Sequence, residues 1–554
     1  MEQSIFKKAK MPGKKNIDVF LGLNRKDVIA ENEFSDLLNI DGAHYPMLAP
    51  RRARTKAVTQ SGIKAVIADN NMDGDALTSF TGVAGTQFYY KGITKGAVSG
   101  NASTCLVDFN GTVLIFPDKK YYNYVTDEFG DIEVGYTNIS VTFGSSGSED
   151  TNNLTNTISK TGGWGDVFKS GDSLALEFAG KPKNSTFTVN SKYTQADDNQ
   201  IVSCVVAKVD GNLLYVNCYN RLGVKLAFQT GSASGTVKKA MPDITRACVA
   251  NNRVFGIDNG GELVYASKLG DFTNWNVFEG LSTDSWYAQV GTEGKFTGIA
   301  ALNSGIILFK RNYLHEVFGS TPQNFTIPKQ TGIGCIDARS VCEAAGSLFF
   351  LSRDGFYLYN GGTPRRISEK LNETYVAAIS GCDGKRVYVC ADTSSGANTA
   401  SRQEQLVYDL ERQTWYRQDV QSGTVAFLPY NGRFYIAADG GMFDVSGSGY
   451  SDNWYAVSKP FTESTFDHKS AINLYARFQL SVGAWVQVYR RVNGGMFELC
   501  GEIRRESSFD TRTVMRIPIR IHKGDSYQIK FTGSGDVRIE ALETVISVGG
   551  RTEQ

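Results

Sequence analysis

The sequence has little of what usually marks a nucleic-acid, membrane or histidine-based site. Its 554 residues include only 4 His and 12 Pro, and 58 Lys and Arg are balanced by 57 Asp and Glu, which leaves a net charge of +1. This balance creates no overall field that would attract nucleic acid or an anionic membrane surface. Uninterrupted apolar runs stay short of the roughly 18 to 20 residues that cross a membrane. We therefore expect no membrane span.

Cysteine occurs nine times, but in no pattern that builds a disulfide framework or a zinc site. The count is odd, and there is no Cys-x-x-Cys pair or Cys/His cluster at metal-ligand spacing. Several cysteines lie inside apolar runs such as 202–206 and 387–390, which favours buried thiols. Residues 1–15 are basic without the apolar segment of a signal peptide. We expect the chain to be made and folded in a reducing cytosol.

Motifs that carry specific chemistry are missing too. The sequence has no Gly-x-Ser-x-Gly elbow, P-loop, His-Glu-x-x-His motif, EF-hand loop or Gly-x-Gly-x-x-Gly after a strand. Its histidines, 44, 315, 468 and 522, are scattered, and His315 lies between apolar residues of an expected strand, where a packed histidine is favoured over a base. The sequence thus predicts no catalytic, cofactor-binding or metal-ligating residue, which removes these specific signatures but not enzymes in general.

One short phrase recurs between residues 244 and 445: a turn pair, an apolar run, a second turn and a second apolar run. Clear copies begin at Gly346-Ser347 and Asn431-Gly432, and their two turns lie about eight positions apart. That interval fits two antiparallel strands joined by tight turns. First turns at 252, 304, 346, 383 and 432 follow one another at 37 to 52 residues, close to the roughly 40 to 50 residues of a four-stranded propeller blade. We predict a β-propeller of six or seven blades.

The repeat is interrupted between Asn110 and Asn252, which are 142 residues apart. One blade of about 45 residues leaves room there for an inserted module. The all-β chain is therefore divided into five parts: an N-terminal arm (1–51), a first propeller part (52–136), an inserted small β-domain (137–237), a second propeller part (238–459) and a C-terminal β-sandwich of jelly-roll-like type (460–554). Within the insert, residues 144–153 have the composition of a flexible loop, and four strands are expected, among them 185–189.

Arginine is concentrated at the polar positions of the C-terminal strands. The most prominent members are Arg490, Arg491, Arg504, Arg505, Arg516 and Arg520. Two interpretations remain open: a solvated sheet face, or a subunit interface or phosphate-facing surface.

Several phrases resemble the tail proteins of tailed bacteriophages, in particular the DNA-stabilisation or nozzle proteins of short-tailed phages. The lead-in contributes Leu21-Gly-Leu-Asn and 45–51. The propeller contributes Asp243-Ile-Thr-Arg, Asn252-Arg-Val-Phe-Gly, 263–275, 307–319, 332–335 and 352–357. The C-terminal part contributes 516–521 and 531–539. The resemblance covers most of the chain outside the insert and consists of phrases rather than an active-site signature.

The resemblance implies a structural virion protein that is not an enzyme. Such a nozzle or hub subunit forms a homo-oligomeric ring, usually a hexamer, that extends the DNA channel below the portal and adaptor. It contacts other tail proteins, helps to retain the packaged genome and takes part in DNA ejection, during which genomic DNA passes through it. It is assembled in the host cytoplasm and resides in the viral tail. The near-zero net charge suits a conduit through which DNA slides, since each neutralised phosphate adds affinity.

Two alternatives remain at this point. The first is a tail-borne receptor- or polysaccharide-binding propeller, possibly with glycosidase activity, which would require two carboxylates about 5 to 10 Å apart. The Ser-x-Asp-x-Gly-x-x-Trp box of sialidase-like propellers is absent, and Trp275 and Trp415 are expected to pack blades rather than bind sugars. The second alternative is a cellular propeller scaffold.

Overall fold

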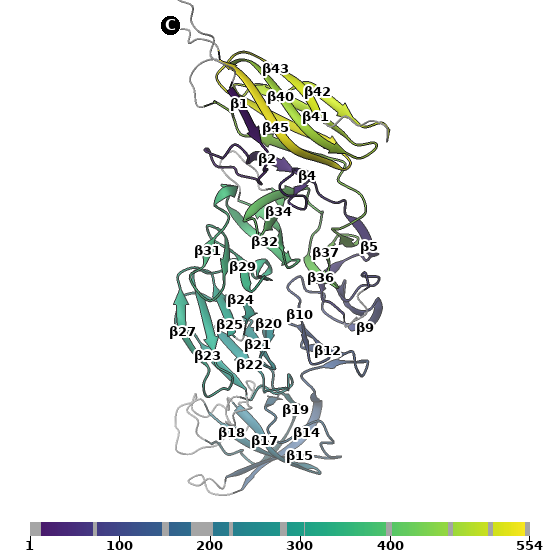
Figure 1. Ribbon diagram of the computed structural model, residues 1–554. Helices are drawn as coiled ribbons and strands as arrows, with labels where there is room; N and C mark the ends of the chain where they lie inside the picture. The colour runs from purple at the N-terminus through teal and green to yellow at the C-terminus, as the bar shows by residue number, and fades with distance from the viewer. Residues whose placement is uncertain are drawn as a thin grey trace, which may run out of the picture. The chain divides into compact units, whose positions relative to one another are not determined.

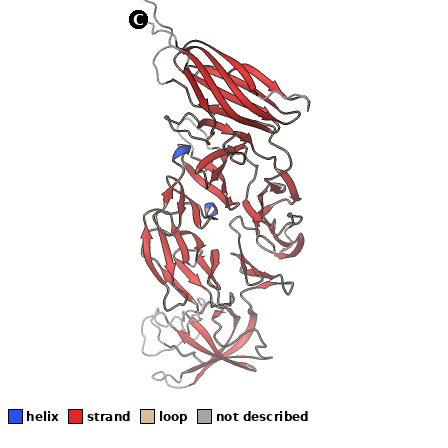
Figure 2. Ribbon diagram, in the orientation of Figure 1, coloured by secondary structure: helices blue, strands red, loops and turns tan. Residues whose placement is uncertain are grey.

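The computed structural model describes residues 13–69, 75–146, 154–178, 203–220, 225–276, 285–303, 305–394, 402–463, 469–507 and 514–548. Their regular elements are β-strands (Figure 2), apart from two short 3-10 turns, η1 (Ala338–Ser340) and η2 (Glu369–Leu371). No helix in these ranges has the length and hydropathy of a membrane span. The chain divides into two compact units, the first made of residues 1–63, 68–80 and 339–554, and the second of 64–67 and 81–338.

The second unit contains four antiparallel sheets of four strands each, in which neighbours in sequence are neighbours in space. They are β6 (Ile63–Val66), β7 (Gly82–Ala84), β8 (Gln87–Tyr90) and β9 (Ile93–Ala97); β10 (Cys105–Phe109), β11 (Thr112–Phe116), β12 (Lys120–Asn123) and β13 (Glu128–Asp131); β20 (Ile244–Ala250), β21 (Arg253–Asp258), β22 (Leu263–Ala266) and β23 (Trp286–Gln289); and β24 (Phe296–Leu302), β25 (Gly305–Lys310), β26 (Leu314–Phe318) and β27 (Thr326–Thr331).

Consecutive sheets of this unit pack face to face. Phe88 of the first sheet and Ile115 of the second share one core, while Phe116 of the second and Val254 of the third share another. A third core joins the third and fourth sheets and contains Phe255 and Leu308. This face-to-face stacking of meandering sheets is the packing of propeller blades.

The first unit adds three sheets of the same kind. They are β28 (Cys342–Ala344), β29 (Ser347–Ser352), β30 (Gly355–Tyr359) and β31 (Arg365–Arg366); β32 (Tyr375–Cys382), β33 (Arg386–Thr393), β34 (Gln403–Asp409) and β35 (Thr414–Gln418); and β36 (Ala426–Tyr430), β37 (Arg433–Ala438) and β38 (Gly441–Asp444) with β5 (Thr55–Thr59). The outer strand of the last sheet therefore comes from the beginning of the chain, because β5 pairs with β38. The described residues thus contain seven blade-like sheets.

The tight turns follow from their sequence. Asn110 and Gly111 have φ of 49° and 83°, and Asn431 and Gly432 have φ of 48° and 73°. Two successive positive φ values match the right-handed twist of a hairpin, and Asn-Gly adopts them most readily. The recurring turn phrase in the sequence therefore marks real hairpins.

The inserted domain is a six-stranded sheet between the second and third of these blades. Its spatial order is β16 (Leu174–Phe178), β19 (Gly231–Lys239), β14 (Gly135–Ser146), β15 (Thr155–Lys160), β18 (Leu213–Tyr219) and β17 (Ser203–Asp210). The two end strands, β17 and β16, also meet. The amide of Val206 in β17 donates to the carbonyl of Asp172, just before β16, at 2.9 Å, so the sheet closes into a small barrel. Phe143, Trp164 and Leu176 fill its core.

Two expectations for the insert are changed or left open by the structure. Residues 144–146, predicted as the start of a loop, continue strand β14, because Gly144 pairs with Thr157 of β15. Residues 147–153 and the expected strand at 185–189 lie outside the described residues.

The C-terminal sandwich of the first unit consists of a four-stranded and a five-stranded sheet (Figure 1). The four-stranded sheet contains β1 (Gly13–Ile17), β45 (Val537–Val548), β40 (Lys469–Leu480) and β43 (Val514–Gly524). The five-stranded sheet contains β2 (Phe34–Leu38), β39 (Trp454–Ser458), β44 (Tyr527–Ser534), β41 (Trp485–Val492) and β42 (Glu498–Arg504). Most successive strands cross between the sheets, as in a jelly roll.

The N-terminal arm is therefore part of the other modules. Its strands β1 and β2 enter the two sheets of the sandwich, and a short pair, β3 (Ile40–Asp41) and β4 (Ala49–Pro50), precedes β5. The fold is a β-propeller with an inserted β-domain and a C-terminal β-sandwich, which confirms the predicted fold class.

Candidate functional site

The predicted arginine group is divided between the two sheets of the sandwich. Arg490 and Arg491 are successive residues of β41, so their side chains leave the strand on opposite sides. Arg504 ends β42 in the same sheet, and Arg505 follows it. Residues 516 and 520 belong to β43 in the other sheet, and the side chain of Arg520 lies outside the described part of the chain.

Each described member of this group has a partner within the sandwich. Arg490 donates to Glu498 Oε2 at 2.8 Å, and Arg491 lies over the Phe497 ring at 4.6 Å and donates to Gln528 at 2.9 Å. The remaining three contact Glu502 (Arg504, 3.6 Å), the Leu480 carbonyl (Arg505, 2.6 Å) and Asn473 (Arg516, 3.2 Å). The contacts of Arg490, Arg491 and Arg516 link neighbouring strands, that of Arg504 lies within β42, and that of Arg505 reaches β40 of the other sheet. An interface or phosphate-facing role for the group stays a prediction.

A more concentrated set of polar contacts lies where the N-terminal arm crosses the propeller sheets of the first unit. Arg25 of the arm forms a two-pronged pair with Glu404 of β34, at 3.0 and 2.9 Å. The Tyr375 hydroxyl donates to the same carboxylate at 3.2 Å. Burial by itself raises the pKa of Glu404, but the hydrogen bonds and charge of Arg25, together with Arg402, bring it below its ordinary value. The pair is a largely buried ion pair that joins the arm to β34.

The backbone of the arm also approaches the propeller closely. The Leu23 amide donates to the carbonyl of Trp415 at 2.6 Å. A Cβ at Gly22 would lie 2.2 Å from that same carbonyl oxygen, so only glycine permits the approach. Further along, Asp36 forms an ion pair with Arg417 at 2.9 Å. The arm is thereby fixed to sheet β32–β35 at several points.

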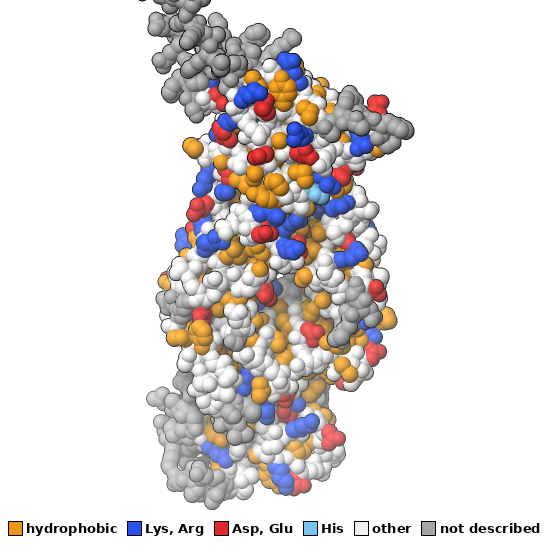
Figure 3. All heavy atoms as spheres, viewed as in Figure 1, with side chains coloured by type: hydrophobic (Ala, Val, Ile, Leu, Met, Phe, Trp, Pro, Cys, Tyr) orange, Lys and Arg blue, Asp and Glu red, His pale blue; other side chains and the backbone are white. Residues whose placement is uncertain are grey.

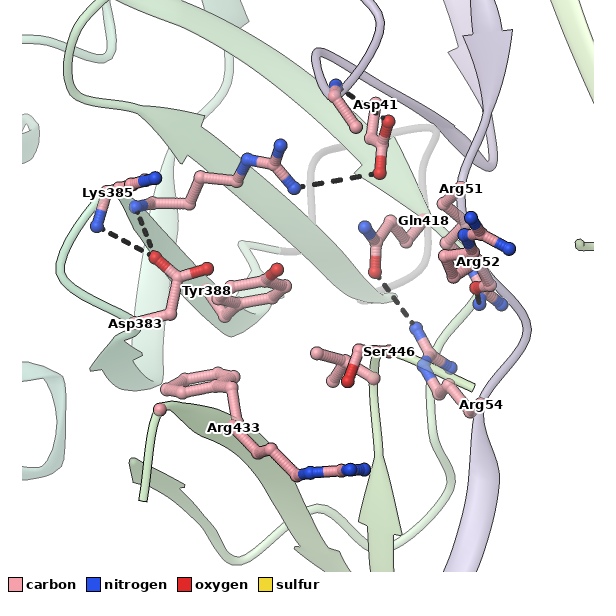
Figure 4. A pocket seen from close by; sticks show the side chains of 15 residues that line it. Asp41, Arg51, Arg52, Arg54, Asp383, Lys385, Tyr388, Gln418, Arg433 and Ser446 are labelled. Atoms are coloured by element: carbon pink, nitrogen blue, oxygen red, sulfur yellow. Dashed lines mark hydrogen bonds and ion pairs between the residues drawn. The ribbon is translucent and has the colours of Figure 1, made fainter. Parts of the chain in front are cut away.

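Beyond β4, three arginines at the end of the arm and just after it lead into a cavity of about 290 Å³. Figure 4 shows it bounded by the arm on one side and by turns of two blade sheets on the other. Its cationic lining residues are Arg51, Arg52, Arg54, Lys385, Arg386 and Arg433, and its acidic ones are Asp41 and Asp383. Figure 3 shows Lys and Arg side chains gathered over the region of β4 and β34 on the same face as Figure 1.

The cations of this pocket differ in depth. The side chains of Arg51 and Arg54 are 8% and 6% exposed and form the inner wall. Arg433 is half-exposed at 50%, and Arg52 and Lys385 are exposed as residues, so they form the rim. An anion would therefore meet the rim before the buried guanidinium groups.

Most of the inner cations are held by protein groups. Arg51 contacts Asp419 and donates to Asn39 at 2.9 Å, and Arg54 donates to Gln418 at 3.2 Å. The Nε of Arg54 is buried and has no hydrogen-bond partner among the described residues. Such an unmet charged donor is costly in a protein interior.

The pocket disfavours further positive charge. Burial, followed by the charge of Arg51, lowers the pKa of Arg54 to about 10. Burial raises the pKa of Asp41, although Arg386 lies 3.6 Å from its carboxylate and favours the ionised form. Arginine retains its proton at neutral pH even so. The pocket is positive in balance, and one of its two carboxylates ionises less readily than usual.

The histidines and cysteines show no comparable grouping. His315 of β26 is 2% exposed and shares a hydrogen bond of 2.8 Å with Thr292, and burial, then the nearby charge of Lys310, lowers its pKa. His468 and the side chain of His522 lie outside the described residues. The nine cysteines are free thiols, and no cluster of His, Cys, Asp and Glu in the described ranges could hold a metal ion. Trp275 and Trp415 are buried, as predicted.

The arm contacts and the pocket were not anticipated from the sequence. The one available signal was the run Arg51-Arg52-Ala-Arg54 directly after a proline-bounded strand. Three arginines in four residues place successive side chains on both sides of an extended chain. Two of their partners, Asp419 and Gln418, are more than 300 positions away, which no local pattern specifies.

No protein-family model matches the chain, and no curated protein does either. Among solved structures, it is similar to an exo-β-1,3-galactanase from Phanerochaete chrysosporium, with 10% identity, 59% of this chain and 89% of that chain covered, and a TM-score of 0.18. It is also similar to the N-terminal domain of Nup159 (12%, 66% and 97%, TM-score 0.24). A third is a glycoside hydrolase family 43 arabinoxylan arabinofuranohydrolase from Bacillus subtilis (9%, 81% and 95%, TM-score 0.16). Scores this low carry no argument about chemistry.

Proposed function

We propose that the protein is a structural subunit of a bacteriophage tail, a nozzle or hub protein. It forms a ring, extends the DNA channel below the portal and adaptor, helps to retain the packaged genome and takes part in its ejection. One observation carries the proposal: segments of the lead-in, the propeller and the sandwich that resemble this family are joined directly to one another in the first unit.

The joints can be followed residue by residue. Leu48 of the lead-in and Ile539 of the C-terminal phrase exchange two backbone hydrogen bonds, at 3.1 and 2.9 Å. On the propeller side, Phe356 packs against Trp415 with ring centroids 5.6 Å apart, and the carbonyl of Trp415 accepts the amide of Leu23. The similar phrases of the first unit therefore belong to one continuous set of contacts, which supports a shared architecture.

This construction suits a part that carries mechanical load. The arm contributes one strand to each sheet of the sandwich, and its Arg25 pairs with Glu404 of β34. The chain then continues into β5, the closing strand of the last blade sheet. Separating the sandwich from the propeller would require breaking all of these at once. A conduit that withstands the pressure of packaged DNA needs such joints within each subunit.

The sandwich also offers a surface for ring contacts. Strands β42 and β43 each have a single neighbour in their sheets as described, and they lie at one edge of the sandwich. Leu499 on β42 and Val514 on β43 are 54% and 53% exposed. Open strand edges with exposed apolar side chains are typical sites of association between subunits. A head-to-tail contact of this kind generates a ring when its rotation closes.

The ring is tested with the purified full-length chain by native mass spectrometry and negative-stain imaging. We expect a closed oligomer, and we expect Leu499→Glu with Val514→Glu to dissociate it. Val125→Glu serves as the control, because Val125 is 77% exposed but lies in the second unit, outside this edge. A protein that stays monomeric at high concentration would contradict the proposal. So would saturable binding and hydrolysis of a polysaccharide in a glycan screen, which would favour the receptor-binding alternative.

A further inference from the structure

The arginine pocket is not needed for the ring role, and its cations come from separate parts of the chain. The end of the arm and the residues just after it supply three, the turn before β33 supplies Lys385, and the first residues of β33 and β37 are Arg386 and Arg433. They surround a cavity of about 290 Å³ rather than follow a strand as a row. This arrangement can hold a compact anion from several sides.

The pocket also has unused hydrogen-bonding capacity. The buried Nε of Arg54 lacks a partner, and the ammonium group of Lys385 forms no ion pair or hydrogen bond in the described structure. Arg433 is held through one terminal nitrogen by Asp444, at 3.1 Å, and is still half-exposed. Donors are thus available on three sides: Arg54 on the inner wall, Lys385 in the turn before β33, and Arg433 at the start of β37.

The shape and charge select the class of ligand. A phosphate group carries about −1.5 to −2 charges near neutral pH and presents several strong acceptor oxygens in a tetrahedral arrangement. That geometry matches donors that converge from three directions, whereas a planar carboxylate is satisfied by one guanidinium fork. Duplex DNA is favoured less, because its phosphates run along two extended backbones and call for an extended track of cations.

We propose that this pocket, formed by Arg51, Arg54, Arg386, Lys385, Arg433 and Arg52, binds a phosphate group, either as inorganic phosphate or as the terminal group of a small phosphate monoester. The ligand adds a second anion to Asp419, which already contacts both Arg51 and Arg54, and joins the arm to two blade sheets. The site is independent of the ring proposal, since it lies entirely within one subunit.

The test is isothermal titration of the purified protein at constant ionic strength, with inorganic phosphate, with glucose 6-phosphate and with a 20-base-pair duplex. We expect saturable binding of phosphate. Lys385→Gln with Arg433→Gln removes two rim cations and should weaken it at least roughly thirtyfold, since each charge-assisted contact is worth severalfold or more. Arg54→Gln tests the inner wall, and the rim variant remains informative where Arg54→Gln does not fold.

Arg504→Gln is the matched control, because Arg504 is 51% exposed and also pairs with a carboxylate, but lies on the sandwich. It should bind phosphate like the unmodified protein. Binding of glucose 6-phosphate as well as phosphate identifies a monoester site, and binding of phosphate alone identifies a site for the free ion. Absence of saturable binding overturns the proposal, as does equal weakening by Arg504→Gln. Pocket-dependent binding of the duplex without any binding of phosphate also overturns it.

Discussion

Replacing Arg25 by glutamine should loosen the N-terminal arm, because it leaves the carboxylate of Glu404 buried without its main partner. The Glu404 side chain is 3% exposed and that of Arg25 is 16% exposed. Both terminal guanidinium nitrogens of Arg25 donate to the Glu404 carboxylate, whereas Arg402 adds one contact at 3.2 Å. The variant therefore tests whether this pair closes the joint between arm and propeller.

Breaking a buried ion pair from one side costs about 3 to 5 kcal/mol. Because Arg402 and Tyr375 still contact the carboxylate, we expect the lower end, about 3 kcal/mol. Each 1.36 kcal/mol is a factor of ten, so the arm should open on the order of a hundred times more often. Hydrogen exchange measured by mass spectrometry reports this opening directly, and the amide of Arg25, which donates to the Lys370 carbonyl at 2.7 Å, lies in the reporting segment.

The neighbouring residue provides the control. Lys26 pairs with Glu369 at 3.4 Å, but their side chains are 45% and 61% exposed. Exposed pairs contribute up to about 1 kcal/mol, so Lys26→Gln should accelerate exchange no more than about fivefold. Equal exchange in the Arg25→Gln and Lys26→Gln proteins would refute the reasoning. Acceleration spread evenly over both units would refute it too, since it would indicate a global change rather than opening of the arm.

Three further predictions follow from the same structure. The pKa of Glu404 lies below its ordinary value of 4.5, so its stabilising effect is complete above that pH and is lost as the pH falls through the lower folded-state pKa; urea midpoints of the wild type and Arg25→Gln should differ equally at pH 7 and 5.5 and converge only below 4.5. Gly441→Ala should cost about 2 to 4 kcal/mol in urea unfolding, because a Cβ there would lie 2.0 Å from the Val58 carbonyl of the closing strand, whereas Gly432→Ala, with open space, should cost about 1 kcal/mol. Burial and the adjacent Cys204 raise the pKa of the Cys218 thiol, so iodoacetamide at pH 8 should modify Cys500 well before Cys218 in native protein, as judged by mass spectrometry.

Local patterns in the sequence specify the hairpins because their causes are local. The Asn110-Gly111 and Asn431-Gly432 turns need two positive φ values, and these residues adopt them at little cost. The regular spacing of such turns indicates blades, and its interruption locates the inserted domain. Both conclusions require only the conformational preferences of a few neighbouring residues.

Strand β5 shows what local patterns omit. Its residues read as the beginning of the first blade, yet it pairs with β38, nearly 400 residues later. Strands β1 and β2 likewise join sheets made by the end of the chain. Pairing with a distant partner depends on which edge is open in the folded protein, and that information is spread over the whole sequence.

The arginines illustrate the same limit for sites. The conspicuous group in the C-terminal strands is divided between two sheets, and its described members contact residues of their own module. The pocket instead combines arginines around the end of the arm with Lys385 of a turn and Arg433 at the start of β37, each unremarkable in its own segment. A site assembled from separate turns becomes visible only once the tertiary contacts are known.

The central claim, a ring-forming subunit of a phage tail, is tested most directly by imaging purified particles of the phage that encodes this chain, with an antibody fragment bound to the protein. The account predicts a closed ring of identical subunits below the portal and adaptor, on the axis of the DNA channel. Absence of the chain from the particles, or its location on peripheral fibres away from that axis, would contradict the account.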